Sequence, residues 1–126
     1  MGSKSDLESN LSNLVEAIAC VEGVVAIILF GSRARGDYDE YSDYDLLVVF
    51  QNENIMWKNR RKLFENVGKL GLFAQVLTRS IKELAEKTEP TFLQNVLDQG
   101  TLLYPSYPLK APAFLRNLKQ IANSKP

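Results

Sequence analysis

The chain is 126 residues long with 45% hydrophobic and 24% charged residues, values typical of one globular domain rather than a disordered or collagen-like chain. Lys plus Arg and Asp plus Glu number 15 each, so the net charge is zero. A nucleic-acid partner is therefore disfavoured, and its binding would require a local basic patch. The sequence has no histidine and one cysteine, which excludes His-ligated zinc, Ser-His-Asp and Cys-His catalysis and an internal disulfide.

The first half of the chain predicts a helix, two strands and a charged loop. Apolar residues recur at helical spacing through 5–23 and a glycine closes the pattern, which predicts an amphipathic helix. The next segment, VVAIILF at 24–30, is short, apolar and β-rich, and predicts a strand covered on both faces. Residues 31–44, GSRARGDYDEYSDY, predict a turn, or one helical turn, and then an exposed loop. A second buried strand, DLLVVF, is expected at 45–50.

The second half of the chain alternates helical and extended patterns, with prolines concentrated near the end. The expected elements are helix 55–70, strand 72–78, helix 81–87, helix 89–100, a short extended piece at 101–112 and a last helix at 113–123. We therefore expect one α/β (α+β) domain with a small mixed β-sheet flanked by helices. We place the domain at residues 1–104 and a Pro-rich C-terminal extension with a short helix at 105–126.

Membrane segments and export signals are not expected from the sequence. No apolar run approaches the roughly 20 residues that span a bilayer, and the N-terminal residues lack the apolar core of a signal peptide. We therefore predict a cytoplasmic protein with no membrane partner.

Two aspartates, Asp43 and Asp45, stand at the entrance to the second predicted strand. Alternate side chains of a strand point to the same face, so the two carboxylates lie on one side, about 6 to 7 Å apart at the backbone. Two such anions repel each other unless they stay solvated or share a hard cation such as Mg²⁺, which prefers oxygen ligands. The pair is therefore a candidate site for Mg²⁺ or Mn²⁺.

A Gly-Ser turn, Gly31 and Ser32, precedes the aspartates and supplies a complementary group. Exposed backbone amides at such a turn and the Ser32 hydroxyl form a natural seat for a phosphate, and a glycine lets the backbone approach an oxyanion closely. A phosphate seat facing a metal site suits an enzyme that holds a nucleoside triphosphate while an acceptor hydroxyl attacks it.

The segment GSRARG, followed by DYD with ten residues between Ser32 and Asp43, resembles the signature of the polymerase-β-like nucleotidyltransferase superfamily, and the chain length resembles that of its minimal members, the MNT domains. This resemblance implies a nucleotidyltransferase fold and the transfer of a nucleoside monophosphate from an NTP, with ATP as the expected donor. It implies that Gly31 and Ser32 hold the β- and γ-phosphates and that Asp43 and Asp45 ligate the metal. Arg33 and Arg35 are candidates for binding phosphate, and one of them can instead anchor the loop by pairing with an aspartate.

Members of this superfamily usually carry a third carboxylate on the next strand, and the expected third strand has none. Gln75 is the polar residue nearest that role, although the sequence favours an ordinary half-exposed strand position for it. An amide can coordinate Mg²⁺ but brings no charge and is a poor base. Two functions follow: an active nucleotidyltransferase, or a catalytically weak or inactive nucleotide-binding partner subunit of the MNT antitoxin type, paired with a HEPN protein. The sequence does not select among three acceptors of the nucleoside monophosphate: an antibiotic, a protein tyrosine and an RNA end. It is also compatible with a homodimer.

Overall fold

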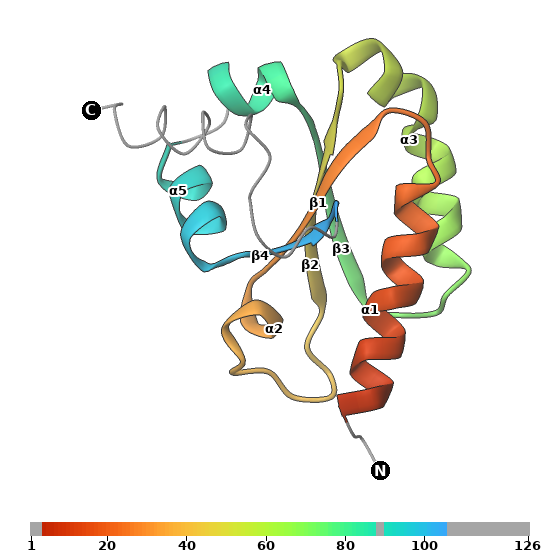
Figure 1. Ribbon diagram of the computed structural model, residues 1–126, viewed down its shortest axis with the longest axis vertical. Coiled ribbons are helices and arrows are strands. Elements are labelled where there is room, and N and C mark those ends of the chain that lie inside the picture. The colour runs from red at the N-terminus through yellow and green to blue at the C-terminus, as the bar shows by residue number, and fades with distance from the viewer. Residues whose placement is uncertain (1–3, 88–89, 106–126) are drawn as a thin grey trace.

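A four-stranded β-sheet with two helices on each face forms the structure, a computed structural model that describes residues 4–87 and 90–105 (Figure 1). A short helix, α2, lies at one end of the sheet beside the loop between β1 and β2. The expected mixed sheet flanked by helices is confirmed. In chain order the elements are α1 (Lys4–Ala19), β1 (Val24–Phe30), α2 (Ser32–Arg35), β2 (Tyr44–Phe50), α3 (Glu53–Gly68), β3 (Ala74–Ser80), α4 (Ile81–Glu86), α5 (Pro90–Gln99) and β4 (Thr101–Tyr104).

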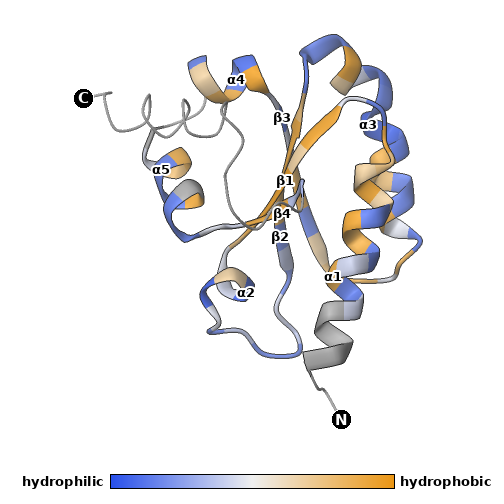
Figure 2. Cartoon of the chain, in the orientation of Figure 1, coloured by the Kyte–Doolittle hydropathy of each residue, from blue (hydrophilic) through white to orange (hydrophobic). Residues whose placement is uncertain are grey.

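The strands follow the order β3-β2-β1-β4 across the sheet, so β3 is an edge strand of the described sheet. β1 pairs antiparallel with β2 and with β4, while β2 and β3 run parallel over seven residue pairs. Helix α3 connects the two parallel strands, as a crossover between parallel neighbours requires. The two central strands are covered on both faces, which explains why their sequences are almost continuously apolar (Figure 2).

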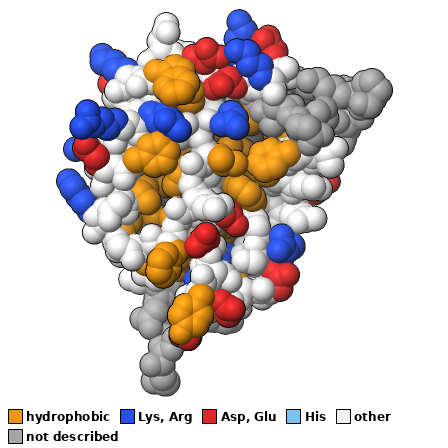
Figure 3. Space-filling model, turned by 180° about the vertical axis from the view of Figure 1, so that it is seen from behind, with side chains coloured by type: hydrophobic (Ala, Val, Ile, Leu, Met, Phe, Trp, Pro, Cys, Tyr) orange, Lys and Arg blue, Asp and Glu red, His pale blue; other side chains and the backbone are white. Residues whose placement is uncertain are grey.

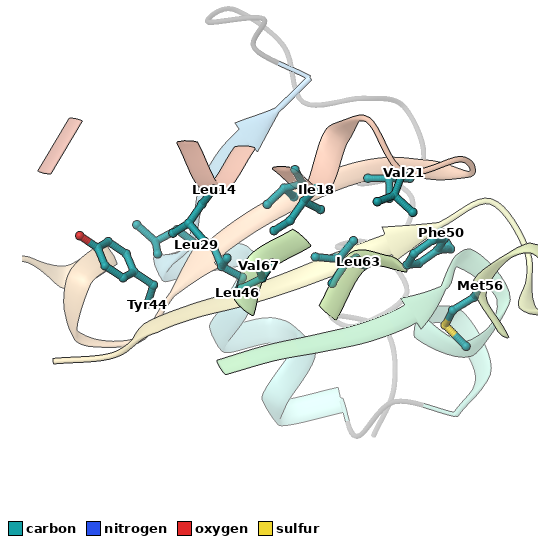
Figure 4. Close-up of a cluster of buried hydrophobic side chains, with 13 residues drawn as sticks. Leu14, Ile18, Val21, Leu29, Tyr44, Leu46, Phe50, Met56, Leu63 and Val67 are labelled. Carbon is teal, nitrogen blue, oxygen red and sulfur yellow. The ribbon is translucent and has the colours of Figure 1, made fainter. Parts of the chain in front are cut away.

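The larger hydrophobic core lies between the sheet and the helices α1 and α3 (Figure 4). Every second residue of β2 points into it, because side chains alternate along a strand. β1 contributes Val24, Ile27 and Leu29, and the longer step after Val24 coincides with a register shift between Val24 and Ala26. Tyr44 lies at the end of this core nearest the loop and is 3% exposed. The residues labelled in the close-up are Leu14, Ile18, Val21, Leu29, Tyr44, Leu46, Phe50, Met56, Leu63 and Val67.

A second, smaller core lies on the opposite face, under α4 and α5. Leu47 and Val49 of β2 belong to it, together with Leu84 of α4 and Leu93 of α5. By the same alternation Asp45 lies on this face, two residues before Leu47. The aspartate therefore lies at the end of β2 next to the loop, on the face that α4 and α5 cover.

Several element boundaries differ from those expected from the sequence. Helix α1 ends at Ala19 rather than at Gly23, because tight turns occupy the last residues: the Val21 amide donates to Ile18 O and the Val24 amide to Val21 O. Helix α3 begins at Glu53, two residues early, because the Asn52 side chain caps it by accepting from the Ile55 amide at 2.9 Å.

The C-terminal predictions are tested only in part. The extended piece expected after Gly100 is confirmed in its first residues, which form β4 and add to β1 at the edge of the sheet. The extension and helix predicted within 106–126 lie outside the described residues. Within the described part of the chain, no helix combines the length and apolar character needed to cross a membrane.

Candidate functional site

The Gly-Ser turn forms the junction between β1 and α2. β1 ends at Phe30, and Gly31 takes φ 74° and ψ −158°, a backbone conformation that is essentially restricted to glycine. The amides of Ala34 and Arg35 both donate to the Gly31 carbonyl at 3.1 Å, so one helical turn follows directly. Gly36, with φ 89°, ends that turn, and its amide donates to Ser32 O at 2.9 Å. The single helical turn considered from the sequence is present.

Asp45 packs against this turn, because the sheet register places it directly opposite Phe30. A Cβ atom added at Gly31 would overlap Oδ2 of Asp45 and lie 3.1 Å from its Cγ. The bare Cα of Gly31 is therefore what makes room for the carboxylate. Asp43 stands one residue before β2 and shares the face of Asp45 through strand alternation. The structure thus brings together the two parts of the site that the sequence separates by a loop.

Gln75 lies on the other side of Asp45, where β3 pairs with β2. The two are register partners, and paired residues of neighbouring strands lie about 4.8 Å apart with side chains on the same face. Gln75 is exposed. Phe30, Asp45 and Gln75 therefore form one row across three strands, with Gln75 at the edge of the sheet.

The electrostatics of the pair favour a bound cation. Burial raises the pKa of Asp45 above its ordinary value, the nearby charge of Asp43 raises it further, and Arg35 lowers it. Two carboxylates that destabilise each other's charge are relieved by a shared divalent cation, and their oxygens suit Mg²⁺ or Mn²⁺. No cluster of three or more His, Cys, Asp or Glu side chains suited to a metal occurs among residues 4–87 and 90–105. Asp43 and Asp45 are the side chains that fit such an ion, and Gln75 is the register partner of Asp45 on β3.

A stability effect follows from the raised pKa of Asp45. A raised pKa means that ionised Asp45 costs folding free energy at pH values above its folded pKa, and that this cost disappears as the pH falls below the unfolded value of 3.8. In the absence of divalent metal, we expect Asp45→Asn to increase the free energy of unfolding at pH 7. Urea denaturation with EDTA at pH 7 and at pH 3.5 measures it. A gain that is equal at both pH values would show that charge is not its cause.

The two arginines of the loop play different structural parts. The Arg33 guanidinium lies over the Tyr44 ring, 4.0 Å from its centroid, and 4.8 Å from the centroid of Tyr38. Its Nε donates to Ser42 O at 3.0 Å, and its Nη2 to Asp39 O at 3.4 Å. Arg33 therefore holds the loop together from within, through backbone carbonyls and aromatic rings rather than through an aspartate side chain.

Arg35 is partly exposed and pairs with Asp37, with Nε 3.4 Å from Oδ1. Both side chains are about half exposed or more, at 47% and 65%, so the pair holds Arg35 weakly. Because Arg35 also lowers the pKa of Asp45, its charge reaches the carboxylate pair. Of the two arginines, Arg35 is the one available to a phosphate.

A cavity of about 290 Å³ adjoins the turn, with Gly31 and Arg35 on one side and helix α5 on the other. Phe92 of α5 contacts Phe30 edge to face, with ring centroids 5.8 Å apart, and both rings line the cavity. No pattern in the sequence links α5 to this cavity, because its residues follow the motif by about sixty positions and show an ordinary amphipathic pattern.

Comparison with known proteins identifies the family of the chain. A family model described as polymerase beta, nucleotidyltransferase, matches residues 12–107. Two proteins of Methanocaldococcus jannaschii, both named as proposed protein adenylyltransferases, are similar in sequence. One is 38% identical over 79 residues, covering 62% of this chain and 76% of its own length, and the other is 36% identical over 75 residues, covering 59% and 73%.

Solved structures of toxin–antitoxin systems are similar in fold. A toxin–antitoxin structure with AMP-PNP superposes with a TM-score of 0.59 at 19% identity, over 93% of this chain and 84% of that one. A structure of a tri-AMPylated HEPN toxin from Shewanella oneidensis in complex with its MNT antitoxin gives 0.57 at 16% identity, over 93% and 83%. At these identities the likeness is one of fold. The matched family model and the sequence relatives carry the assignment, and the chain belongs to the polymerase-β nucleotidyltransferase family.

Proposed function

We propose that the chain binds ATP together with Mg²⁺ and transfers its AMP group to an acceptor hydroxyl. The observation that carries this proposal is the contact between Gly31 and Asp45, which joins a phosphate seat to a carboxylate pair. In this arrangement Gly31 and Ser32 hold the β- and γ-phosphates, and the exposed guanidinium of Arg35 neutralises part of their charge. Asp43 and Asp45 hold the divalent cation, which when bound neutralises phosphate charge and positions the leaving group.

The transfer is a substitution at the α-phosphorus. The acceptor oxygen forms a bond to this atom while the bond to the oxygen bridging the β-phosphate breaks, and pyrophosphate leaves with both electrons of that bond. The acceptor proton passes to water, because the described site offers Gln75 where a third carboxylate would accept it. The chain's own contribution is to hold the phosphates in line with the acceptor.

We propose a protein as the acceptor. The relatives named as proposed protein adenylyltransferases support this class, and so does the structural neighbour in which an MNT antitoxin is bound to a tri-AMPylated HEPN toxin. A HEPN-type protein is accordingly the partner we propose to test first.

The second candidate function is a nucleotide-binding partner subunit with little or no transferase activity. The observation that favours it is the position of Gln75, which faces Asp45 in the register where a carboxylate would complete the metal site. A neutral amide there supplies neither charge nor a base.

The substitution Gln75→Asp separates the two functions. If only the third ligand is missing, the added carboxylate beside Asp45 should increase AMP transfer, by about 10²-fold or more for a gained general base. The measurement is transfer of label from α-³²P-ATP with Mg²⁺ to a purified HEPN-type partner, with Gln75→Glu as a second variant of the same charge. Gln75→Asn, which keeps the amide, is the matched control.

Each result selects one function. Label on the partner with the wild-type protein establishes the transferase and shows that Gln75 suffices. Label only with Gln75→Asp identifies a chain that lost catalysis with this one carboxylate. No label with any variant, in preparations that bind Mg·ATP, favours the partner subunit.

A further inference from the structure

The edge strand β3 lies on the side of the carboxylate pair opposite to the phosphate seat. The row formed by Phe30, Asp45 and Gln75 crosses β1, β2 and β3 in that order, with about 4.8 Å between neighbouring strands. Gly31 follows Phe30 and begins the phosphate seat, so the seat lies at the β1 end of the row. Gln75 lies at the open end.

Because the displacement is in line, the order of the strands determines the side from which the acceptor approaches the α-phosphorus. The attacking oxygen and the leaving oxygen stand on opposite sides of the α-phosphorus. With pyrophosphate held at the turn after β1 and the α-phosphate above Asp45 on β2, the attacking oxygen comes from above β3. The acceptor must therefore reach the site across the edge of the sheet, beside Gln75.

The surface at this edge is both aromatic and acidic. Phe73 precedes β3 and is 69% exposed, yet its backbone is fixed, because Phe73 O accepts from the Tyr44 amide at 2.8 Å. Tyr41 of the neighbouring loop is 76% exposed. The exposed side chains of Asp39 and Glu40 lie in the same loop. Seen from behind, hydrophobic and acidic side chains lie close together in the lower half of the molecule, while Lys and Arg side chains gather mostly in the upper half (Figure 3).

We propose that Phe73, with the acidic residues of the loop before β2, forms the docking surface for the acceptor, and that the acceptor is a basic protein segment carrying the reactive hydroxyl. This proposal rests on the proposed function, since it describes how that site receives its acceptor. Exposed aromatic side chains on a fixed backbone are effective anchors for a partner. The negative charge of the loop steers a segment rich in Lys and Arg toward the site and disfavours an acidic one.

The test measures docking separately from catalysis. Fluorescein-labelled peptides of equal length, one basic and one acidic, each with a central hydroxyl side chain, are titrated with the full chain in the presence of Mg²⁺ and AMP-PNP. Fluorescence anisotropy gives the peptide Kd, and calorimetry gives the Kd of Mg·AMP-PNP for the same preparations. The variants are Phe73→Ser and Glu40→Lys, with Trp57→Ser as the matched control, because Trp57 is 63% exposed but lies on α3.

We expect the basic peptide to bind in preference to the acidic one, and Phe73→Ser to weaken that binding by about tenfold or more. Glu40→Lys should weaken it by a smaller factor, because an exposed charge contributes less. Trp57→Ser should leave peptide binding unchanged, and all variants should bind Mg·AMP-PNP as the wild type does.

Two results would overturn the docking surface: equal or absent binding of the two peptides while Mg·AMP-PNP binds, or wild-type peptide binding by Phe73→Ser. A wild-type chain that does not bind Mg·AMP-PNP contradicts the proposed function itself, so the two failures are distinguishable.

Discussion

Replacing Asp45 by asparagine is expected to weaken the Mg²⁺-dependent binding of ATP by at least about 100-fold, since changes to the outer partners of metal ligands alone cost 10- to 100-fold. The side chain keeps its shape and its place against Gly31 but loses the charge that a divalent cation requires. Both proposed functions need this carboxylate, so the loss of binding is expected whether or not the wild type transfers AMP. Isothermal titration with ATP, with Mg²⁺ and with EDTA, measures it.

Asp39→Asn is the matched control for this change. Asp39 lies in the loop before β2, and its Oδ1 accepts from the Tyr41 amide at 2.8 Å, a bond that asparagine retains. Nucleotide binding should therefore change little. An Asp45→Asn protein that binds Mg·ATP with wild-type affinity would refute both the enzyme and the nucleotide-binding subunit.

Gly31→Ala is expected to damage both stability and the site. With φ 74° and ψ −158°, an alanine at this position costs on the order of 1–3 kcal/mol in backbone strain. Its Cβ would also overlap the Asp45 carboxylate, so that carboxylate must move away from the phosphate seat. We expect a lower melting temperature and a loss of Mg·ATP binding of tenfold or more, measured on the fraction that remains folded.

Gly36→Ala is the control that separates the effect of backbone strain from the effect of moving the Asp45 carboxylate. Gly36 also has a positive φ, 89°, but a Cβ there meets no atom of the described residues within 4 Å. The left-handed conformation costs an alanine about 1–2 kcal/mol, so stability should fall while nucleotide binding persists. Equal losses of binding in the two variants would mean that the clash with Asp45 has no role.

Most of the fold could be predicted from local patterns. Strands β1 and β2 were evident because both faces of each are covered, which requires nearly continuous apolar residues in the sequence. Boundaries were less accurate where a side chain rather than periodicity decides them, as with the Asn52 cap that extends α3 toward its N-terminus. The order of the strands cannot be predicted from local patterns, because it depends on which strands, distant in the sequence, pair in the folded sheet.

The candidate site was predictable in its residues but not in their contacts. Spacing alone pointed to Gly31, Ser32, Asp43 and Asp45, but the close approach of the Asp45 carboxylate to Gly31 depends on the antiparallel register of β1 and β2. The sequence did not decide which arginine anchors the loop, because the partners of Arg33 are backbone carbonyls, which any residue has, and two tyrosine rings that come close only in the folded loop. The edge position of Gln75 follows from the sheet order alone.

The arginine enclosed by the loop has a consequence for the energetics of ligand capture. Arg33 contacts the rings of Tyr38 and Tyr44 and donates to the carbonyls of Asp39 and Ser42, so it restrains the segment 38–44 when the protein folds. The conformational entropy of that segment is therefore already lost before a nucleotide arrives. If a nucleotide binds as proposed, we therefore expect little further ordering of the loop, and the affinity should depend chiefly on the contacts that the nucleotide itself makes.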